Sequence, residues 1–264
     1  TAYEIVDCDW SSDVCSSDLR ADRAPRRSAA VSSGADWGNV RYGKGFRTEA
    51  CLKRLGTHAD LGQPLSVLDV GSNRGSFARA LLAAAPNAQL TCVEPDERVV
   101  QSCAGLERTT LVHARIEDAA LAEESFDVVH SCHTIEHLAS PYAVLTDHWR
   151  TLKQGGLLIV DAPNIALIGG DDILEEWFID KHLYHFSRAT LTWLLTACGF
   201  EIVGSPDPAD RENLLFAARK RPLPARSVRR DPSEVEWSRA LIASYVKNRD
   251  RKSTRLNSSH SQQS

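Results

Sequence analysis

The alternation of elements along this 264-residue chain predicts a doubly wound α/β fold. Short apolar runs alternate with segments of helical periodicity through residues 47–200. The first run, residues 65–70, ends in a turn containing Gly71 and Gly75, and a helical segment follows. In such folds the carboxyl ends of the parallel strands meet at one edge of the sheet, where ligands bind. We therefore look for the functional residues just after each strand.

Each expected element has a local signal. Helices are predicted at 47–55, where Gly56 lies near the end, at 76–85 before Pro86, and at 97–103 after Pro95. Pro141 favours the first turn of a helix over 141–152, and Ser187 is a suitable cap for a helix over 188–198. Strands are predicted at 65–70, 88–93, 109–113, 125–132, 157–161, 200–204 and 213–219, the last two as an antiparallel hairpin.

The turn after the first strand reads Asp69-x-Gly71-x-x-x-Gly75. Gly71 would let the backbone turn where a Cβ atom would clash, and Gly75 would let a ligand approach the helix closely. The free N–H groups at the start of that helix favour an electron-rich ligand. A tight turn without any ligand is the alternative interpretation.

Glu94 follows the second strand, 19 residues beyond Gly75. A carboxylate at this point of a βαβ unit can accept hydrogen bonds from ribose hydroxyls. Dinucleotide-binding folds use an acid in the same way, so Glu94 does not discriminate between cofactors, and a solvated loop carboxylate is the alternative.

Four motifs resemble those of class I S-adenosylmethionine (SAM) methyltransferases of the small-molecule, methyltransferase-11/23-like type. They are the glycine turn, with Asn73 at the usual middle glycine, the FDVV…IEH…P stretch in 126–141, the K-x-G-G turn at 153–156, and HFS…GF in 185–200. The resemblance covers roughly residues 40–219. It implies a Rossmann-like seven-stranded sheet, mostly parallel with an antiparallel last strand, and S-adenosyl-L-methionine as cofactor. It also implies O- or C-methylation of a small-molecule, sugar, glycan or lipid-linked acceptor.

The resemblance also implies a set of site residues. Cofactor binding falls on the glycine turn and the following strand ends, with Ile116 and Glu117 as the adenine contact: Asp69, Gly71, Ser72, Asn73, Gly75, Glu94, Pro95, Ile116, Glu117 and His133. Candidate catalytic residues are His133, His137 and His185, and His182 is a further proton acceptor, because imidazole titrates near neutrality. Purely structural histidines are the alternative.

No metal ligands are assigned. His133-x-x-Glu136-His137 has the spacing of a zinc-peptidase motif, which needs a long helix, whereas this segment caps a strand-to-helix turn. A weaker divalent-cation site on these three residues stays open, although capping and substrate contact are favoured.

Two other functions compete with methyl transfer. A nicotinamide-dependent oxidoreductase would be expected to carry G-x-G-x-x-G, whereas here the spacing is Gly71-x-x-x-Gly75. A non-catalytic SAM-binding module would keep the crevice and lack an acceptor site.

Composition argues against several partners. The net charge is −4, which gives no electrostatic case for nucleic acid or membrane binding. We find no apolar run of the ~18–20 residues that a membrane span needs. The cysteines are scattered without C-x-x-C spacing, which argues against a disulfide framework and a zinc site and favours a reducing, cytoplasmic location.

The two ends are excluded from the fold. Residues 9–19 and 250–260 resemble translated sequencing adapter and its reverse complement, so 1–19 and 250–264 are interpreted as artefact. The remaining residues are expected to form a lead-in at 20–46, a methyltransferase domain at 47–219, a basic linker at 220–231, and at 232–249 the start of a truncated C-terminal helix or domain.

Overall fold

The computed structural model describes residues 47–167, 182–208, 210 and 212–222, together with residues 236, 239, 240 and 243. Several of the expected segments lie outside or almost wholly outside these residues. They are the two adapter-like ends, the lead-in at 20–46, most of the basic linker, and the helix expected at 232–249, and residues 168–181 lie outside as well.

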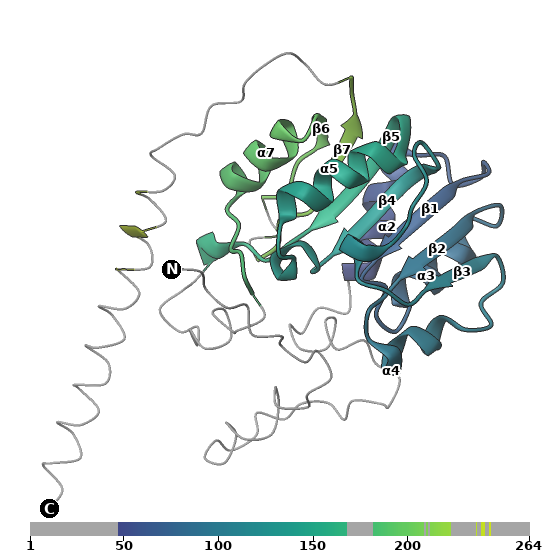
Figure 1. Cartoon of the computed structure of the whole chain (residues 1–264). Coiled ribbons are helices and arrows are strands. Elements are labelled where there is room, and N and C mark those ends of the chain that lie inside the picture. The colour runs from purple at the N-terminus through teal and green to yellow at the C-terminus, as the bar shows by residue number, and fades with distance from the viewer. Residues whose placement is uncertain are drawn as a thin grey trace, which may run out of the picture.

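A seven-stranded sheet forms the centre of the domain, in the order β3-β2-β1-β4-β5-β7-β6 (Figure 1). The strands are β1 (Ser66–Val70), β2 (Gln89–Val93), β3 (Thr109–Val112), β4 (Phe126–Cys132), β5 (Leu152–Asp161), β6 (Phe200–Gly204) and β7 (Phe216–Lys220). The first five pair in parallel, and β7 runs antiparallel to both β5 and β6. The mostly parallel sheet with an antiparallel last strand is therefore confirmed.

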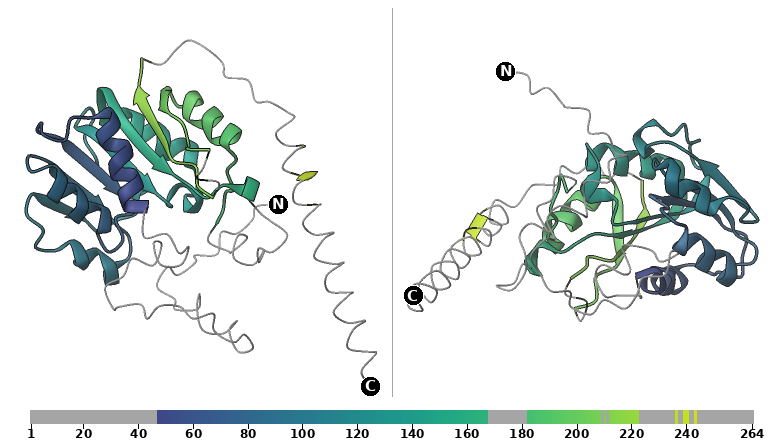
Figure 2. Two further views of the ribbon diagram at one scale, coloured as in Figure 1. Left: turned by 180° about the vertical axis from the view of Figure 1, so that it is seen from behind. Right: turned by 90° about the horizontal axis from the view of Figure 1, so that it is seen from below.

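Helices cover both faces of the sheet, as Figure 1 and the reverse view in Figure 2 show. On one face α2 (Arg47–His58) and α3 (Ser76–Ala84) pack their apolar side chains against the strands, and on the other face α5 (Pro141–Thr151) and α7 (Arg188–Ala197) do the same. The sheet thus has a hydrophobic core on each side, which is the layering that the alternating pattern predicts.

Shorter helices follow several strands. These are α4 (Glu97–Val100) and the 3₁₀ turns η2 (Gln101–Cys103), η3 (Ile116–Asp118), η4 (Ile135–His137) and η5 (Ile165–Leu167). The helix expected over 97–103 is therefore one α-helical turn continued by a 3₁₀ turn. Among the described residues, no helix is long and apolar enough to cross a membrane.

Two strand boundaries differ from the predicted ones. β5 begins at Leu152 instead of residue 157, because Leu152 pairs with Phe126 and its carbonyl accepts a hydrogen bond from Lys220 Nζ at 2.6 Å. β7 begins at Phe216 instead of residue 213, because Asn213 forms only an isolated bridge with Pro163. Neither difference moves the carboxyl ends of the parallel strands, where the predicted site residues lie.

Candidate functional site

The turn after β1 is held in a conformation that favours glycine. Gly71, Asn73 and Gly75 have φ angles of 68°, 46° and 74°. The N–H groups of Gly71 and Ser72 both donate to the carbonyl of Val93 at the end of β2, at 2.9 and 3.2 Å. The turn therefore lies against the tip of β2, and Asn tolerates the left-handed conformation at the position where glycine is usual.

Packing within the protein explains both glycines. A Cβ atom on Gly71 would overlap the Thr134 side chain, and one on Gly75 would lie 2.5 Å from Cys103 Sγ. The sequence suggested that Gly75 leaves room for a ligand, whereas the space beside it is taken by Cys103. The glycines let the loops after β1, β2 and β4 pack close together at the carboxyl edge, where a ligand crevice is expected.

Glu94 lies at the tip of β2 directly beside this turn. Its carboxylate accepts hydrogen bonds from the N–H of Asn73 at 2.8 Å and of Asp96 at 3.0 Å, and the residue is 7% exposed. Burial raises the pKa of Glu94 above its ordinary value. Each carboxylate oxygen can accept a further hydrogen bond, so the geometry fits a ligand that presents vicinal hydroxyls.

Asp69 is placed differently from the other predicted cofactor residues. It is 1% exposed, and its Oδ1 lies 2.7 Å from Nδ1 of His130, its register partner on β4. Phe77 stacks on the His130 ring with 3.5 Å between centroids. Asp69 therefore lies in the core beneath the crevice, under the α2 and α3 face.

The predicted adenine contact divides into a buried and an exposed residue. Ile116 is buried and packs in the same core cluster as Val93 and Ile135. Glu117 is exposed and forms an ion pair with Arg115 at 3.4 Å, and Pro95 is also exposed. The structure thus brings these positions to one edge of the sheet, and their contact with a cofactor stays a prediction.

His133 stands at the tip of β4 in a left-handed conformation, with φ of 49°. Its Nδ1 lies 3.4 Å from Oε1 of Glu136, and Nε2 of His137 lies 3.8 Å from the same oxygen. Burial, with positive charge nearby at Arg47, lowers the pKa of His133 well below its ordinary value. Burial also raises the pKa of Glu136 to about 8, so this carboxyl group is mostly neutral at pH 7.

A second segment brings two more histidines to this edge. Tyr184 N–H donates to the Glu136 carbonyl at 3.1 Å and thereby docks residues 182–186 on η4. The His182 ring lies 4.8 Å from the His137 ring, and the His185 ring lies 6.1 Å from His182. Ligand atoms of Glu136, His137 and His182 lie within 4.8 Å of one another, close enough to share a cation. Sequence spacing alone did not join His182 to Glu136, because the contact depends on how the loop folds back.

A cavity of about 260 Å³ lies elsewhere, at the opposite edge of the sheet, between residues such as His58, Asp127 and Arg219. Its polar groups already bind one another: Lys153 contacts Asp127 at 2.8 Å, and Arg219 donates to the carbonyls of Gly155 and His58. We place the functional site at the carboxyl edge, where the titratable groups with shifted pKa values gather.

The fold is Rossmann-like, and the residues predicted to bind a nucleoside gather at the carboxyl edge of its sheet. A family model described as "Methyltransferase domain" matches residues 68–160, from β1 through β5. This match, together with the relatives and solved structures described next, supports a class I SAM-dependent methyltransferase domain, which implies S-adenosyl-L-methionine as its cofactor. The nicotinamide alternative is thereby set aside.

Three curated relatives share parts of this domain. An "Uncharacterized methyltransferase" of Mycolicibacterium vanbaalenii is 37% identical over 99 residues, which are 36% of this chain and 38% of the relative. A "Probable S-adenosylmethionine-dependent methyltransferase" of Mycolicibacterium smegmatis is 27% identical over 75% of each chain. A "Ubiquinone biosynthesis O-methyltransferase" of Cereibacter sphaeroides is 32% identical over 38% of this chain. The chain spans well under half the length of the first and third of these proteins, 38% and 42%.

Solved structures share the fold. A SAM-dependent methyltransferase from Aquifex aeolicus superposes with a TM-score of 0.53 at 17% identity, over 66% of this chain and 89% of its own. The [4+2]-cyclase SpnF superposes with a TM-score of 0.57 at 17% identity, over 72% of this chain and 84% of its own. Since one neighbour is named for a different reaction, the fold by itself does not define the chemistry.

The residues of the crevice fit this cofactor. Glu94 has a buried carboxylate of the kind that accepts hydrogen bonds from ribose hydroxyls, and α3 follows Gly75, which provides no side-chain cap for its first N–H groups. The sulfonium of the bound cofactor supplies an electrophilic methyl group, and His133, Glu136 and His137 lie on the loop that follows β4.

Proposed function

We propose that the protein methylates a hydroxyl oxygen of a small molecule, with the acceptor bound against the loop after β4 and residues 182–186. The observation that carries the proposal is the cluster of Glu136, His137 and His182 beside His133, at the edge that also holds the glycine turn. A small-molecule acceptor is supported by the name of the C. sphaeroides relative, an O-methyltransferase of ubiquinone biosynthesis. Sugar, glycan and lipid-linked alcohols are less favoured acceptors within the same proposal, and methylation of a carbon acid is the alternative to it.

In this proposal the chain aligns the acceptor and takes its proton. The acceptor oxygen forms a bond to the methyl carbon while the carbon–sulfur bond breaks, and the hydroxyl proton passes to an imidazole. His137 is our choice of proton acceptor, because its side chain is 25% exposed and lies beside Glu136 and His182. His133 is harder to protonate, since burial lowers its pKa. We therefore give it an orienting role, and we place His185 farther out along the acceptor wall.

Product formation from defined acceptors tests the proposal. The enzyme is incubated with SAM and, separately, a catechol, a simple sugar and a carbon acid, and S-adenosylhomocysteine and the methylated product are measured by mass spectrometry. We expect turnover of the catechol, with His137→Ala reducing kcat by about 10²–10⁴-fold, the usual contribution of a general base. His58→Ala, at the opposite edge of the sheet, is the matched control and should leave turnover unchanged.

The alternatives give different results in the same assay. Tight SAM binding by calorimetry without turnover of any acceptor would indicate a non-catalytic SAM-binding module. Methylation at carbon, or undiminished turnover by His137→Ala, would contradict the proposed proton transfer.

A further inference from the structure

Polar side chains form a row beneath the crevice, on the sheet face that α2 covers. In the sheet register Asp69 of β1 pairs with His130 of β4, and Cys132 of β4 pairs with Asp161 of β5. Because side chains two residues apart on a strand share a face, His130 and Cys132 point to the same side. Arg47 and Cys51 lie one turn apart on α2, and both are buried. The helix thus covers a cluster of polar side chains that spans three strands.

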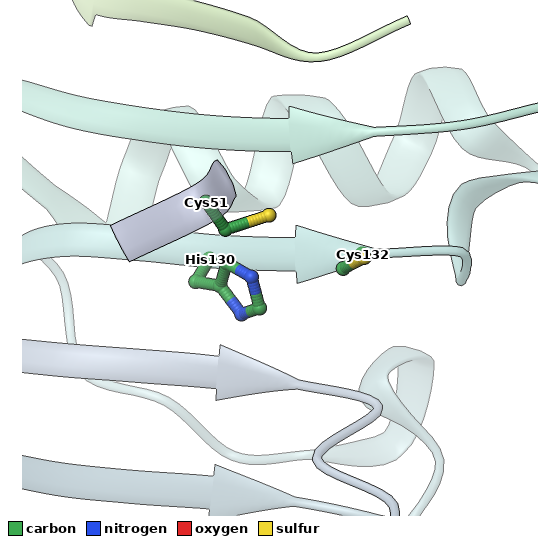
Figure 3. Close-up of side chains that lie close together, drawn as sticks. All are labelled: Cys51, His130 and Cys132. Atoms are coloured by element: carbon green, nitrogen blue, oxygen red, sulfur yellow. The ribbon is translucent and has the colours of Figure 1, made fainter. Parts of the chain in front are cut away.

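Three potential metal ligands lie close together in this polar cluster. Cys51, His130 and Cys132 converge from α2 and β4, as Figure 3 shows, and their donor atoms lie within 4.8 Å of one another. The thiolate and imidazole donors around one zinc ion lie about 3.5–3.8 Å apart, as follows from the ordinary bond lengths and a tetrahedral angle. A movement of about 1 Å therefore suffices for all three to reach one ion.

The hydrogen bonds of His130 favour a ligand at its other ring nitrogen. Nδ1 is taken by Asp69, while Nε2 is fully buried and meets no hydrogen-bond partner of regular geometry among the described residues, and the Cys51 thiol also interacts with this ring. A carboxylate that accepts the second N–H of a histidine is the usual arrangement around metal-bound imidazoles. A buried ring nitrogen without a partner is costly unless something occupies its lone pair.

We propose that Cys51, His130 and Cys132 bind one zinc ion, with Asp69 orienting His130 as a positioning residue. Binding releases the protons of the two thiols and any proton on Nε2, and no electron is transferred. Two thiolates balance the charge of Zn²⁺, and thiolate with imidazole is a donor set that zinc prefers. The fourth position is left to a water molecule, because Asp161, whose Oδ2 lies 3.8 Å from Cys132 Sγ, is already paired with Arg47.

The site would tie α2 to the sheet. Its ligands come from two elements that are far apart in sequence and adjacent in space, so the ion would act as a cross-link beneath the crevice. Cysteine spacing compares only neighbours along the chain, so the expectation of no zinc site did not consider ligands that meet through the fold. The proposal is independent of the methyl acceptor, and it would stand if the acceptor were different.

Metal content of the full-length, tag-free protein tests the site. We expect about one zinc per chain by elemental analysis after purification under reducing conditions. After chelation, one equivalent of Co²⁺ should restore binding and produce sulfur-to-cobalt charge-transfer absorption. Thermal unfolding should shift upward on adding zinc, since the ion binds only the folded chain.

Variants identify the ligands. Cys51→Ala, Cys132→Ala and His130→Ala should each lose the charge-transfer band, and Asp69→Asn should weaken Co²⁺ affinity about 10–100-fold. Cys198→Ala is the matched control, because this buried cysteine packs on the opposite face of the sheet. His137→Ala separates the site from the Glu136 cluster and should leave the band intact.

Three results would overturn the proposal. The first is wild-type protein that takes up no thiolate-bound Co²⁺ although both thiols are reduced. The second is a Cys51–Cys132 disulfide that persists under the reducing conditions of purification. The third is a charge-transfer band that survives in both cysteine variants. The wild-type titration decides the question even if a variant fails to fold.

Discussion

At the residue scale, Glu94 joins the glycine turn to the cofactor crevice. Glu94→Gln should weaken SAM binding about 10–100-fold, because hydrogen bonds to a charged group contribute about 1.5–3 kcal/mol. The new amide nitrogen would also face the N–H donors of Asn73 or Asp96. Calorimetry with SAM measures the loss, and Glu117→Gln, an exposed acid near the predicted adenine contact, should lose less. Unchanged affinity in a folded Glu94→Gln protein would remove Glu94 from the site.

Glu136 gives the site a pH signature. Its folded pKa of about 8 lies above the ordinary value of 4.5, because the carboxyl group is buried. Between these two pH values the folded state binds a proton that the unfolded state has released. The free energy of unfolding of the wild type should therefore fall as pH rises, by at most about 1.4 kcal/mol per pH unit from this group.

Glu136→Gln isolates this contribution. Glutamine is neutral at every pH, so the variant should gain stability relative to the wild type as pH rises from 5 to 8. Denaturant titrations at several pH values measure the difference, which cancels the titration of groups that do not contact Glu136, such as His148, whose pKa burial lowers. A difference that does not change with pH would mean that Glu136 is ionised throughout.

At the element scale, capping sets where α7 begins and thereby fixes the loop that carries His182 and His185. Ser187 Oγ accepts from Thr190 N–H at 3.1 Å, and Thr190 Oγ1 accepts from Ser187 N–H at 2.8 Å. Ser187→Ala removes half of this reciprocal cap and should cost about 1 kcal/mol of unfolding free energy. Ser140→Ala should cost less, because the cap of α5 is a single, longer contact of 3.3 Å at an exposed residue. Equal losses of unfolding free energy in the two variants would indicate that the reciprocal hydrogen bonds of the α7 cap add no stability over a single one.

The order of helices and strands is the feature that the sequence predicted best. The strand and helix order follows from local periodicity, and Pro141, Ser187 and Pro86 mark ends that depend on neighbouring residues only. The boundaries that moved depend on distant partners. Leu152 is extended because it pairs with Phe126, and the stretch after Asn213 is not a regular strand because it meets the loop after β5.

At the scale of the whole molecule, strand order decides which polar residues meet. Asp69 and His130 are 61 residues apart, and their contact exists because β1 and β4 are neighbours in the sheet. Sequence reasoning placed Asp69 at the crevice from its motif and could not find its partner. The Cys51–Cys132 approach and the docking of His182 on η4 have the same origin. Local pattern thus predicted which edge holds the site, while the buried partners required the topology.

The ion pair of Arg47 and Asp161 is the clearest long-range link, since it joins the first described helix to the end of β5 with both side chains buried. Arg47→Met should cost about 3–5 kcal/mol of unfolding free energy, because it leaves a buried carboxylate without its partner. Asp161 already has a pKa raised by burial to about 7, so it can escape the penalty by taking a proton. The loss should therefore be smaller at pH 6 than at pH 8.

The double variant Arg47→Met/Asp161→Asn separates the pair from its surroundings. Adding Asp161→Asn to Arg47→Met removes the unpaired carboxylate, so the double variant should regain part of the unfolding free energy that Arg47→Met loses. The regained free energy should be larger at pH 8 than at pH 6. Urea unfolding of the wild type, the two single variants and the double variant at both pH values gives the coupling free energy. Strictly additive losses would show that the two side chains act separately, and the attachment of α2 to the sheet would then rest on Leu55 and its apolar neighbours.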